Sequence, residues 1–254
     1  MLRLNTCLRV VVAGACLSAS LLGGNASAAT LRVGATSTGI PFTFLDVKTN
    51  TIEGMMVDTA KAVAKAAGDD VKIQQTVFSA LIPSLTSDKI DVISAAMIKT
   101  PERAKVVAFT DPVYTHYGDG LLVRADDKHD YTSLDQLKGK VMGVQAGTTY
   151  YNLLMKKGYF KAIRTYDSIA DMARDLALGR IDAGIGDKPI MAYQIKQGTL
   201  KKVKLEPHYK QEAVGSICLV VRKGDTALLN KLNAAIAKVK ASGELGKITA
   251  KWGI

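Results

Sequence analysis

Short β-branched segments alternate with helical periodicity along most of this chain, and this alternation restricts the fold more than any other feature. A β-branched run followed by a run of period 3.6 is typical of a strand that leads into a helix. Repeated units of this kind build α/β domains with mainly parallel sheets. The predicted strands are 31–33, 71–73, 90–93, 141–144, 181–185 and 203–205, and the predicted helices are 57–67, 79–85, 149–157, 169–178, 188–197 and 226–242.

Two extended segments, about 118–123 and 215–221, interrupt the alternation. The chain has no internal repeat and no flexible linker, so we expect these segments to carry it between two domains as strands. A pair of such crossings forms a hinge. A chain of this length can supply two modest domains with separate hydrophobic cores.

The first 28 residues have the pattern of a secretory signal peptide. Arg3 and Arg9 provide the positive start, an apolar run covers 10–22, and Ala26-Ser27-Ala28 is a small-residue cleavage signal. We therefore expect cleavage after Ala28 and a periplasmic protein. Cys16 leaves a lipid-modified cysteine as an open alternative, although the residues before it fit that signal poorly.

Charge and cysteine content exclude several classes of function. Without the leader the chain carries 32 basic and 23 acidic residues, a net charge of +9 that is dispersed along the sequence. No aromatic residues interleave with its one tight lysine cluster, so we expect no nucleic-acid partner. Cys218 is the single cysteine after the leader and lies in an apolar run, which predicts a buried, inert thiol. Three scattered histidines give no metal-ligand spacing, and we expect no metal and no cofactor.

The tetrapeptide Thr100-Pro101-Glu102-Arg103 follows an apolar strand and has the pattern of a helix start. Thr100 is a good N-cap and Pro101 suits the first helical position, where its missing N–H costs nothing. Arg103 then offers a planar fork of donors that matches a carboxylate. The segment is a candidate carboxylate receptor. The alternative is an ordinary capped helix whose arginine pairs with a surface acid.

Two further strand ends carry polar groups. Gly147-Thr148-Thr149 follows the strand 141–144, and its hydroxyls and free amides lie where a helix is expected to begin. Asp187 ends the strand 181–185 and precedes the helix 188–197, where it can bind a ligand or only cap the helix. Ligands of α/β sheets bind beyond the carboxyl ends of the strands, so both positions are candidates.

In the order in which they occur, these segments resemble one known family: the periplasmic solute-binding proteins of ABC transporters that take polar amino acids (family 3). The resemblance covers residues 30–252. It rests on Leu31-Arg32-Val33-Gly34, Pro41-Phe42-Thr43-Phe44, Leu81-Ile82-Pro83-Ser84-Leu85, residues 89–103, Phe109-Thr110-Asp111-Pro112, Gly147-Thr148-Thr149, Gly179-Arg180-Ile181-Asp182-Ala183 and Ile248-Thr249-Ala250-Lys251-Trp252.

The resemblance implies a type II periplasmic-binding-protein fold, with two parallel-sheet lobes joined by a two-strand hinge. Lobe 1 is then 30–117 plus 222–254, lobe 2 is 124–214, and the hinge strands are about 118–123 and 215–221. It further implies that Arg103 grips a ligand α-carboxylate with help from Thr149 and the neighbouring Thr148. Asp187 then accepts from the α-ammonium, and Phe78 packs on the ligand side chain.

Four positions of the expected ligand site differ from residues that are common in the family. Ile98 stands where a serine or threonine hydroxyl usually joins the ligand cage, and Ala96 where some members have serine. Thr36 and Gly39 replace a common acid and a common aromatic residue of the first loop. Because a cationic side chain would lack its counter-charge, we expect a lysine, arginine or histidine pocket to be disfavoured. The missing ring can come from any of five aromatic residues: Phe42, Phe44, Tyr114, Tyr117 or Tyr150.

These features predict a monomeric receptor that captures a polar amino acid, or a related small amino carboxylate, and delivers it to an ABC permease in the inner membrane. No reaction is implied. The alternative is a lyase on the same fold, similar to the periplasmic cyclohexadienyl dehydratases. That alternative requires a proton donor over the substrate, for which Asp187, His116 and His129 are the candidates.

Overall fold

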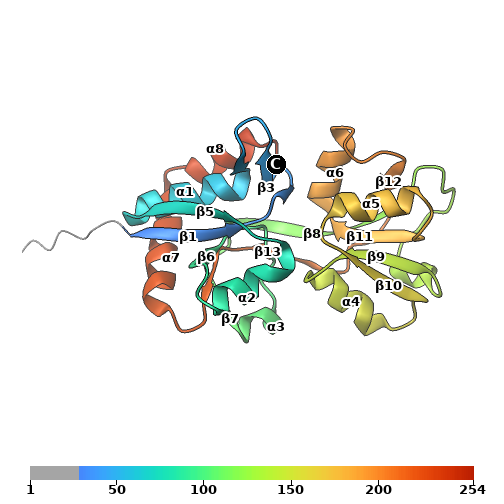
Figure 1. The fold of residues 1–254 in the computed structure, drawn as a ribbon, viewed down its shortest axis with the longest axis horizontal. Helices are drawn as coiled ribbons and strands as arrows, with labels where there is room; N and C mark the ends of the chain where they lie inside the picture. Colours follow the sequence, from blue (N-terminus) through green and yellow to red (C-terminus); the bar gives the residue numbers. More distant parts are fainter. Residues whose placement is uncertain (1–28) are drawn as a thin grey trace, which may run out of the picture.

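The computed structural model describes residues 29–254, which form two α/β lobes that lie side by side (Figure 1). The predicted signal peptide, its cleavage after Ala28 and the question about Cys16 fall outside the described residues. Within residues 29–254, no helix is long and apolar enough to cross a membrane.

The sheet of the first lobe has five strands in the order β5 (Asp70–Gln75), β1 (Thr30–Ala35), β6 (Val92–Ile93), β14 (Val220–Arg222) and β7 (Val107–Phe109). Strand β1 is parallel to both β5 and β6, whereas β14 is antiparallel to β6 and β7. The sheet is therefore mixed, because β14 returns from the other lobe in the opposite direction.

Helices cover this sheet, and a small hairpin sheet adjoins it. The hairpin strands are β2 (Thr38–Gly39), β3 (Thr43–Asp46) and β4 (Thr51–Glu53). The helices are α1 (Met55–Ala67), the short η1 (Phe78–Ala80) with α2 (Leu81–Thr86), α3 (Pro101–Ala104), α7 (Thr226–Ala241) and α8 (Glu244–Lys251).

The sheet of the second lobe has the order β10 (Ala162–Tyr166), β9 (Val141–Gln145), β11 (Ala183–Asp187), β8 (Tyr114–Arg124) and β12 (Val203–Leu205). Strand β9 is parallel to β10 and β11, and β8 is antiparallel to β11 and β12. The lobe also contains η2 (Leu134–Leu137), α4 (Thr149–Lys157), α5 (Ile169–Ala177) and α6 (Lys188–Lys196).

Two neighbouring segments connect the lobes in the centre of the molecule (Figure 1). The first half of β8 pairs with β13 (Val214–Ile217), with Tyr117 opposite Gly215. The second half of β8, from Asp119, pairs with β11 of the second lobe, while β14 already belongs to the first lobe. This pairing favours a crossing at 114–118 and 214–217, slightly earlier than the predicted hinge strands; the predicted lobe limits remain a proposal.

Each predicted strand and helix overlaps an observed element of the same type. The hairpin β2–β4, the strands β7 and β10 and the last helix α8 were not predicted. The hairpin and β7 are too short for a clear period-2 pattern, and β10 has its mostly exposed residues at a sheet edge. Cys218 is buried, as predicted, and burial raises the pKa of its thiol to about 11.

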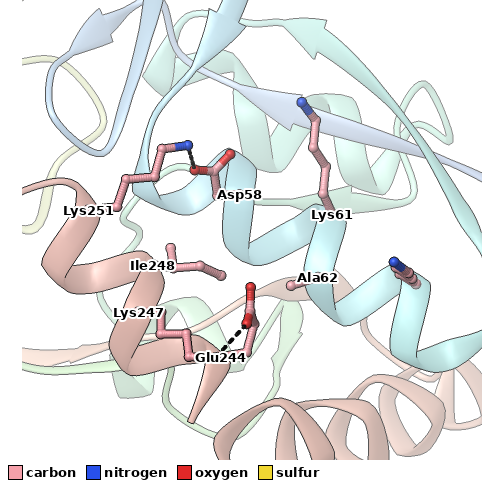
Figure 2. Close-up of a pocket in the computed structure, with 8 residues that line it drawn as sticks. Asp58, Lys61, Ala62, Glu244, Lys247, Ile248 and Lys251 are labelled. Carbon is pink, nitrogen blue, oxygen red and sulfur yellow. Dashed lines mark hydrogen bonds and ion pairs between the residues drawn. The ribbon is translucent and has the colours of Figure 1, made fainter. Parts of the chain in front are cut away.

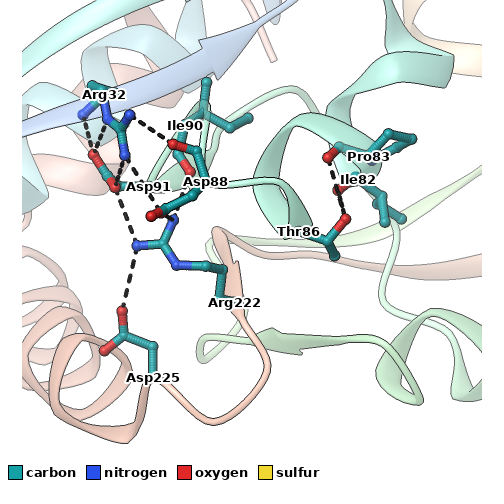
Figure 3. A network of polar contacts seen from close by, with 9 residues as sticks. All are labelled: Arg32, Ile82, Pro83, Thr86, Asp88, Ile90, Asp91, Arg222 and Asp225. Carbon is teal, nitrogen blue, oxygen red and sulfur yellow. Dashed lines mark hydrogen bonds and ion pairs between the residues drawn. The ribbon is translucent and has the colours of Figure 1, made fainter.

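Asp91 ties three segments of the first lobe together at the edge where β6 begins (Figure 3). Its carboxylate accepts from the backbone N–H of Arg32 at 2.9 Å, from the Arg32 guanidinium at 2.7 and 2.9 Å, and from Arg222 Nη2 at 3.1 Å. These hydrogen bonds, those from Arg32 above all, hold the pKa of Asp91 well below its ordinary value. Asp91 therefore links β1 and β14 to the strand between them.

We expect Asp91→Asn to lower the free energy of unfolding by about 2 kcal/mol at pH 7, since hydrogen bonds to a charged group are lost. A lowered pKa stabilises the fold only above the pKa of the unfolded chain, so the difference between variant and wild type should shrink below about pH 4. Urea titration from pH 3 to 8 measures both effects. Asp126→Asn is the control, because its pair with Arg124 spans 3.7 Å and the Asp126 side chain is 87% exposed. Equal losses in the two variants would contradict this role for Asp91.

Candidate functional site

Arg103 lies in the helix that its sequence predicts. The Thr100 hydroxyl accepts from the Arg103 backbone N–H at 3.2 Å, and Pro101 occupies the first turn of α3. This cap begins the helix a few residues after β6, at the side of the first lobe that faces the second lobe. The local sequence thus positions Arg103 at the boundary between the lobes.

The guanidinium of Arg103 bridges the two lobes. Its Nη1 donates to the Ile98 carbonyl at 2.7 Å within the first lobe, and its Nη2 donates to the Gly147 carbonyl at 3.0 Å in the second. The guanidinium carbon lies 5.6 Å from the centre of the Phe78 ring, a cation–π distance. Burial lowers the pKa of Arg103 to about 10 and the charge of Asp187 opposes this, so Arg103 is cationic at neutral pH.

The segment 147–149 forms the facing edge of the second lobe. Gly147 has a φ of +76°, and a Cβ atom there would lie 2.8 Å from the Cα atom of Ser79 in the first lobe. The Thr148 hydroxyl caps α4 by accepting from the Tyr151 N–H at 3.4 Å and donates to the Gln145 carbonyl at 2.7 Å. The Thr148 hydroxyl is thus engaged by the protein's own backbone. Thr149 begins α4 beside it.

Asp187 ends β11, directly opposite Asp119 of β8. It also precedes α6, yet its side chain points to another helix: Oδ1 accepts from the Tyr150 hydroxyl of α4 at 2.7 Å. Burial raises the pKa of Asp187 to about 6, although the Tyr150 and Tyr117 hydroxyls and the charge of Arg103 favour its ionised form. The structure therefore decides against the helix-cap alternative for this side chain.

A small enclosed cavity lies between the lobes beside Asp187. Its volume of about 20 Å³ holds little more than one water molecule, far below the hundreds of cubic ångströms of typical ligand pockets. Entry of an amino acid therefore requires the lobes to separate. The lining residues are Thr36, Thr38, Gly39, Phe42, Thr43, Phe78, Ala95, Ala96, Gln145, Ile169, Asp187 and Ile190.

The predicted site residues divide into three groups. Thr36, Gly39, Phe78, Ala96 and Asp187 line the cavity together. Arg103 does not line the cavity but packs on Phe78, which does. Thr148 and Thr149 begin the helix that holds Tyr150. The Ile98 side chain is buried, and Ile98 pairs with Ile217 of β13 and offers its carbonyl to Arg103.

Two of the unusual residues have clear structural partners. The Thr36 hydroxyl lies 2.6 Å from the Thr43 hydroxyl, and both residues are buried. A Cβ atom on Gly39 would lie 3.3 Å from Ile190 Cδ1, so an aliphatic side chain of the second lobe occupies this space. Among the five candidate rings, Phe42 lines the cavity and packs edge-on against Tyr117 with ring centres 5.1 Å apart.

Sequence reasoning did not identify several residues of the site. Gln145 lines the cavity while its amide donates to the Asp167 carbonyl at 2.8 Å. Gln194 of α6 donates across the lobes to the Thr38 carbonyl at 3.2 Å. The sequence marks Tyr150 only as a candidate aromatic ring for the cavity, not as a donor to Asp187. Its place two residues after a helix cap gave no indication of that contact.

Ala96 has a φ of +52°, in the left-handed region that non-glycine residues seldom adopt. Backbone strain of this kind gathers at binding sites and is maintained by the surrounding structure. Here it sits in the cavity wall, between β6 and the carbonyl of Ile98 that holds Arg103.

A larger hollow of about 520 Å³ lies between α1 and α8 (Figure 2). Lysines dominate its lining, and Lys251 Nζ lies 2.7 Å from Asp58 Oδ2 across it. Both walls belong to the first lobe, so a molecule there would not bridge the lobes. Within residues 29–254, no cluster of three or more His, Cys, Asp or Glu side chains is placed to hold a metal ion.

Comparison with known proteins identifies the family. Residues 31–254 match the bacterial extracellular solute-binding proteins, family 3. This chain is a member of that family. The match covers all of the described fold except its first residues, and the resemblance seen in the sequence is confirmed.

Individual relatives agree with this assignment. The putative ABC transporter arginine-binding protein 2 of Escherichia coli (strain K12) is 35% identical over 95% of this chain and 96% of its own length. The L-cystine-binding protein of the same strain is 31% identical over 88% of this chain and 82% of its own. A solved ancestral arginine-binding protein bound to arginine is 35% identical, with a TM-score of 0.79 over 88% of this chain and 97% of its own.

We expect Gly147→Ala to weaken ligand binding by preventing full closure, because the new methyl group would meet the Ser79 backbone. Gly139→Ala is the matched control: Gly139 has a φ of +73°, and the described residues leave open space around its Cβ position. Both variants carry the same backbone strain, and only Gly147→Ala blocks the lobes. Calorimetry and small-angle scattering with saturating ligand measure affinity and closure. Equal affinities would show that the Gly147–Ser79 contact does not limit closure.

Proposed function

We propose that this protein captures an α-amino acid between its two lobes and presents it to an ABC permease of the inner membrane. The observation that supports this most is a fixed cation and an acid on opposite lobes near one cavity: Asp187 of the second lobe lines it, and Arg103 of the first lobe packs on Phe78, which also lines it. The family assignment supports the transport role.

A zwitterion satisfies both charges at once. Its carboxylate can take donors from Arg103 in place of the Gly147 carbonyl, and its ammonium can donate to Asp187. A ligand that interacts with both lobes binds the closed form more tightly than the open form, and this difference drives closure. A molecule with only one of the two charges leaves the other partner buried and unpaired, which costs several kilocalories per mole.

The cavity wall favours a neutral polar side chain. Thr36, Thr38, Thr43 and Gln145 supply hydroxyl and amide groups, and Asp187 is the single carboxylate in the lining. If Asp187 receives the α-ammonium, no acid of the lining remains for a cationic side chain. We therefore propose a ligand of the glutamine type rather than arginine, although several relatives are named for arginine.

The remaining features of the proposal concern location and chemistry. The protein works in the periplasm as a monomer after cleavage behind Ala28, and it releases its ligand unchanged. His116 is exposed, and its Nδ1 lies 3.1 Å from the Thr115 hydroxyl. His129 Nδ1 lies 2.8 Å from Asp127 Oδ1. Neither histidine lines the cavity. This placement gives the dehydratase alternative no histidine over the cavity.

A thermal-shift panel of the natural amino acids tests this proposal. A ligand with micromolar affinity should stabilise the mature protein by about 4 kcal/mol at millimolar concentration. We expect the largest shift with a neutral polar amino acid and a smaller shift with arginine. No shift with any amino acid would refute the function, whereas a dominant response to arginine would refute only the proposed side-chain preference.

We expect Arg103→Ala to weaken binding of the best ligand at least a hundredfold, which corresponds to about 3 kcal/mol. Isothermal titration calorimetry measures this loss. Arg174→Ala is the control, because the Arg174 side chain is 68% exposed and, within residues 29–254, pairs only with Asp171 on the surface of α5. An unchanged affinity for Arg103→Ala would exclude Arg103 as the carboxylate receptor.

A further inference from the structure

Tyr150 connects the two halves of the proposed ligand site. It is 1% exposed, it follows Thr149 in the first turn of α4, and its hydroxyl donates to Asp187 Oδ1 at 2.7 Å. The same turn therefore contains a threonine of the proposed carboxylate site and a tyrosine that holds the proposed ammonium acceptor. Among the described residues, the Tyr150 hydroxyl is the donor to Asp187, and the buried Tyr117 hydroxyl, which has no hydrogen-bond partner of its own, faces the same carboxylate.

The groups around Asp187 explain why this partly buried carboxylate needs a hydrogen-bond donor. Tyr150 faces it from α4, Arg103 from α3, and Tyr117 and Asp119 from β8. Asp119 is fully buried but accepts from the Tyr209 hydroxyl at 2.6 Å and from the Ala213 N–H at 2.8 Å. The Asp119 carboxylate is thus turned toward the segment around 209–213, and the Tyr150 hydroxyl donates the hydrogen bond to Asp187.

We propose that Tyr150 is a positioning residue for amine recognition: it holds one oxygen of Asp187 and leaves the other to accept from the ligand α-ammonium. This role rests on the proposed function. A hydroxyl donor favours the ionised carboxylate and fixes its orientation. Because the carboxylate is already oriented, binding of the ammonium costs less conformational entropy. Tyr150 thereby selects for amino acids over carboxylates that lack the amine.

A positioning role and a purely structural role of Tyr150 predict different affinities for an amino acid and for its analogue without the α-amine. Loss of the hydroxyl in Tyr150→Phe leaves the ring in place and leaves the carboxylate receptor unchanged. A hydrogen bond to a charged group has a free energy that corresponds to roughly tenfold or more in affinity. We expect this loss of affinity only for ligands that carry the amine. A general defect in packing would weaken both kinds of ligand alike.

The pH dependence gives a second readout. Asp187 accepts an ammonium only when it is ionised, and its pKa is about 6, so affinity for an amino acid should decline as the pH falls below 6. Without the Tyr150 hydroxyl the ionised form loses a stabilising donor, and the decline should begin at a higher pH. Asp187→Asn should remove this pH dependence.

The experiment measures the affinity of wild type, Tyr150→Phe, Asp187→Asn and the double variant, by calorimetry and by competition. The ligands are the best amino acid of the panel and its analogue without the α-amine, from pH 5 to 8. Tyr151→Phe is the matched control, because this neighbouring tyrosine is partly exposed and, among the described residues, it is Tyr150 that donates to Asp187. Melting temperatures report any change in folding.

We expect Tyr150→Phe to weaken the amino acid about tenfold, to leave the analogue within twofold, and to add little further loss in the Asp187→Asn background. Equal weakening of both ligands, an unchanged pH profile or full additivity with Asp187→Asn would overturn the role of Tyr150. A wild-type protein that binds no amino acid would remove the proposed function itself, a result distinct from binding that is indifferent to Tyr150.

Discussion

The partly buried carboxylate of Asp187 is the constraint on which the arrangement of this site depends. An ionised acid removed from water requires hydrogen bonds and an opposite charge, or it becomes protonated. The strand pairing of β11 with β8 places Asp187 at a sheet end, and α4 brings Tyr150 to one of its oxygens. Arg103 supplies the opposite charge from the other lobe, so the acid is best stabilised when the lobes are together.

Close contacts between the lobes show how closely their surfaces match. Arg103 donates to the Gly147 carbonyl, and Gln194 donates to the Thr38 carbonyl. Gly147 lies against Ser79, and Gly39 lies against Ile190. Glycine at both positions permits an approach that a side chain would prevent. These contacts lie beside the cavity. The movement that brings the lobes together therefore also encloses a ligand between them.

Membership of the family does not determine the ligand. The relatives compared above include proteins named for arginine and for L-cystine, at similar levels of identity to this chain. In the cavity lining of this chain, the Thr36 hydroxyl contacts the Thr43 hydroxyl, and the Ile190 side chain fills the space beside Gly39. The charged groups proposed to hold the backbone of an amino acid are separate from the residues proposed to select its side chain. One scaffold can therefore serve several ligands.

The sequence by itself determined the order of the main strands and helices, the cap at Thr100 and the burial of Cys218, because these follow from local periodicity and composition. It also identified the ends of β6, β9 and β11 as the places where polar groups gather. Only the tertiary structure decided that Tyr150 holds Asp187, that Ile190 fills the space beside Gly39 and that Gly147 touches Ser79. These contacts join residues of different elements, or of different lobes, and depend on how the lobes pack, which no local pattern specifies.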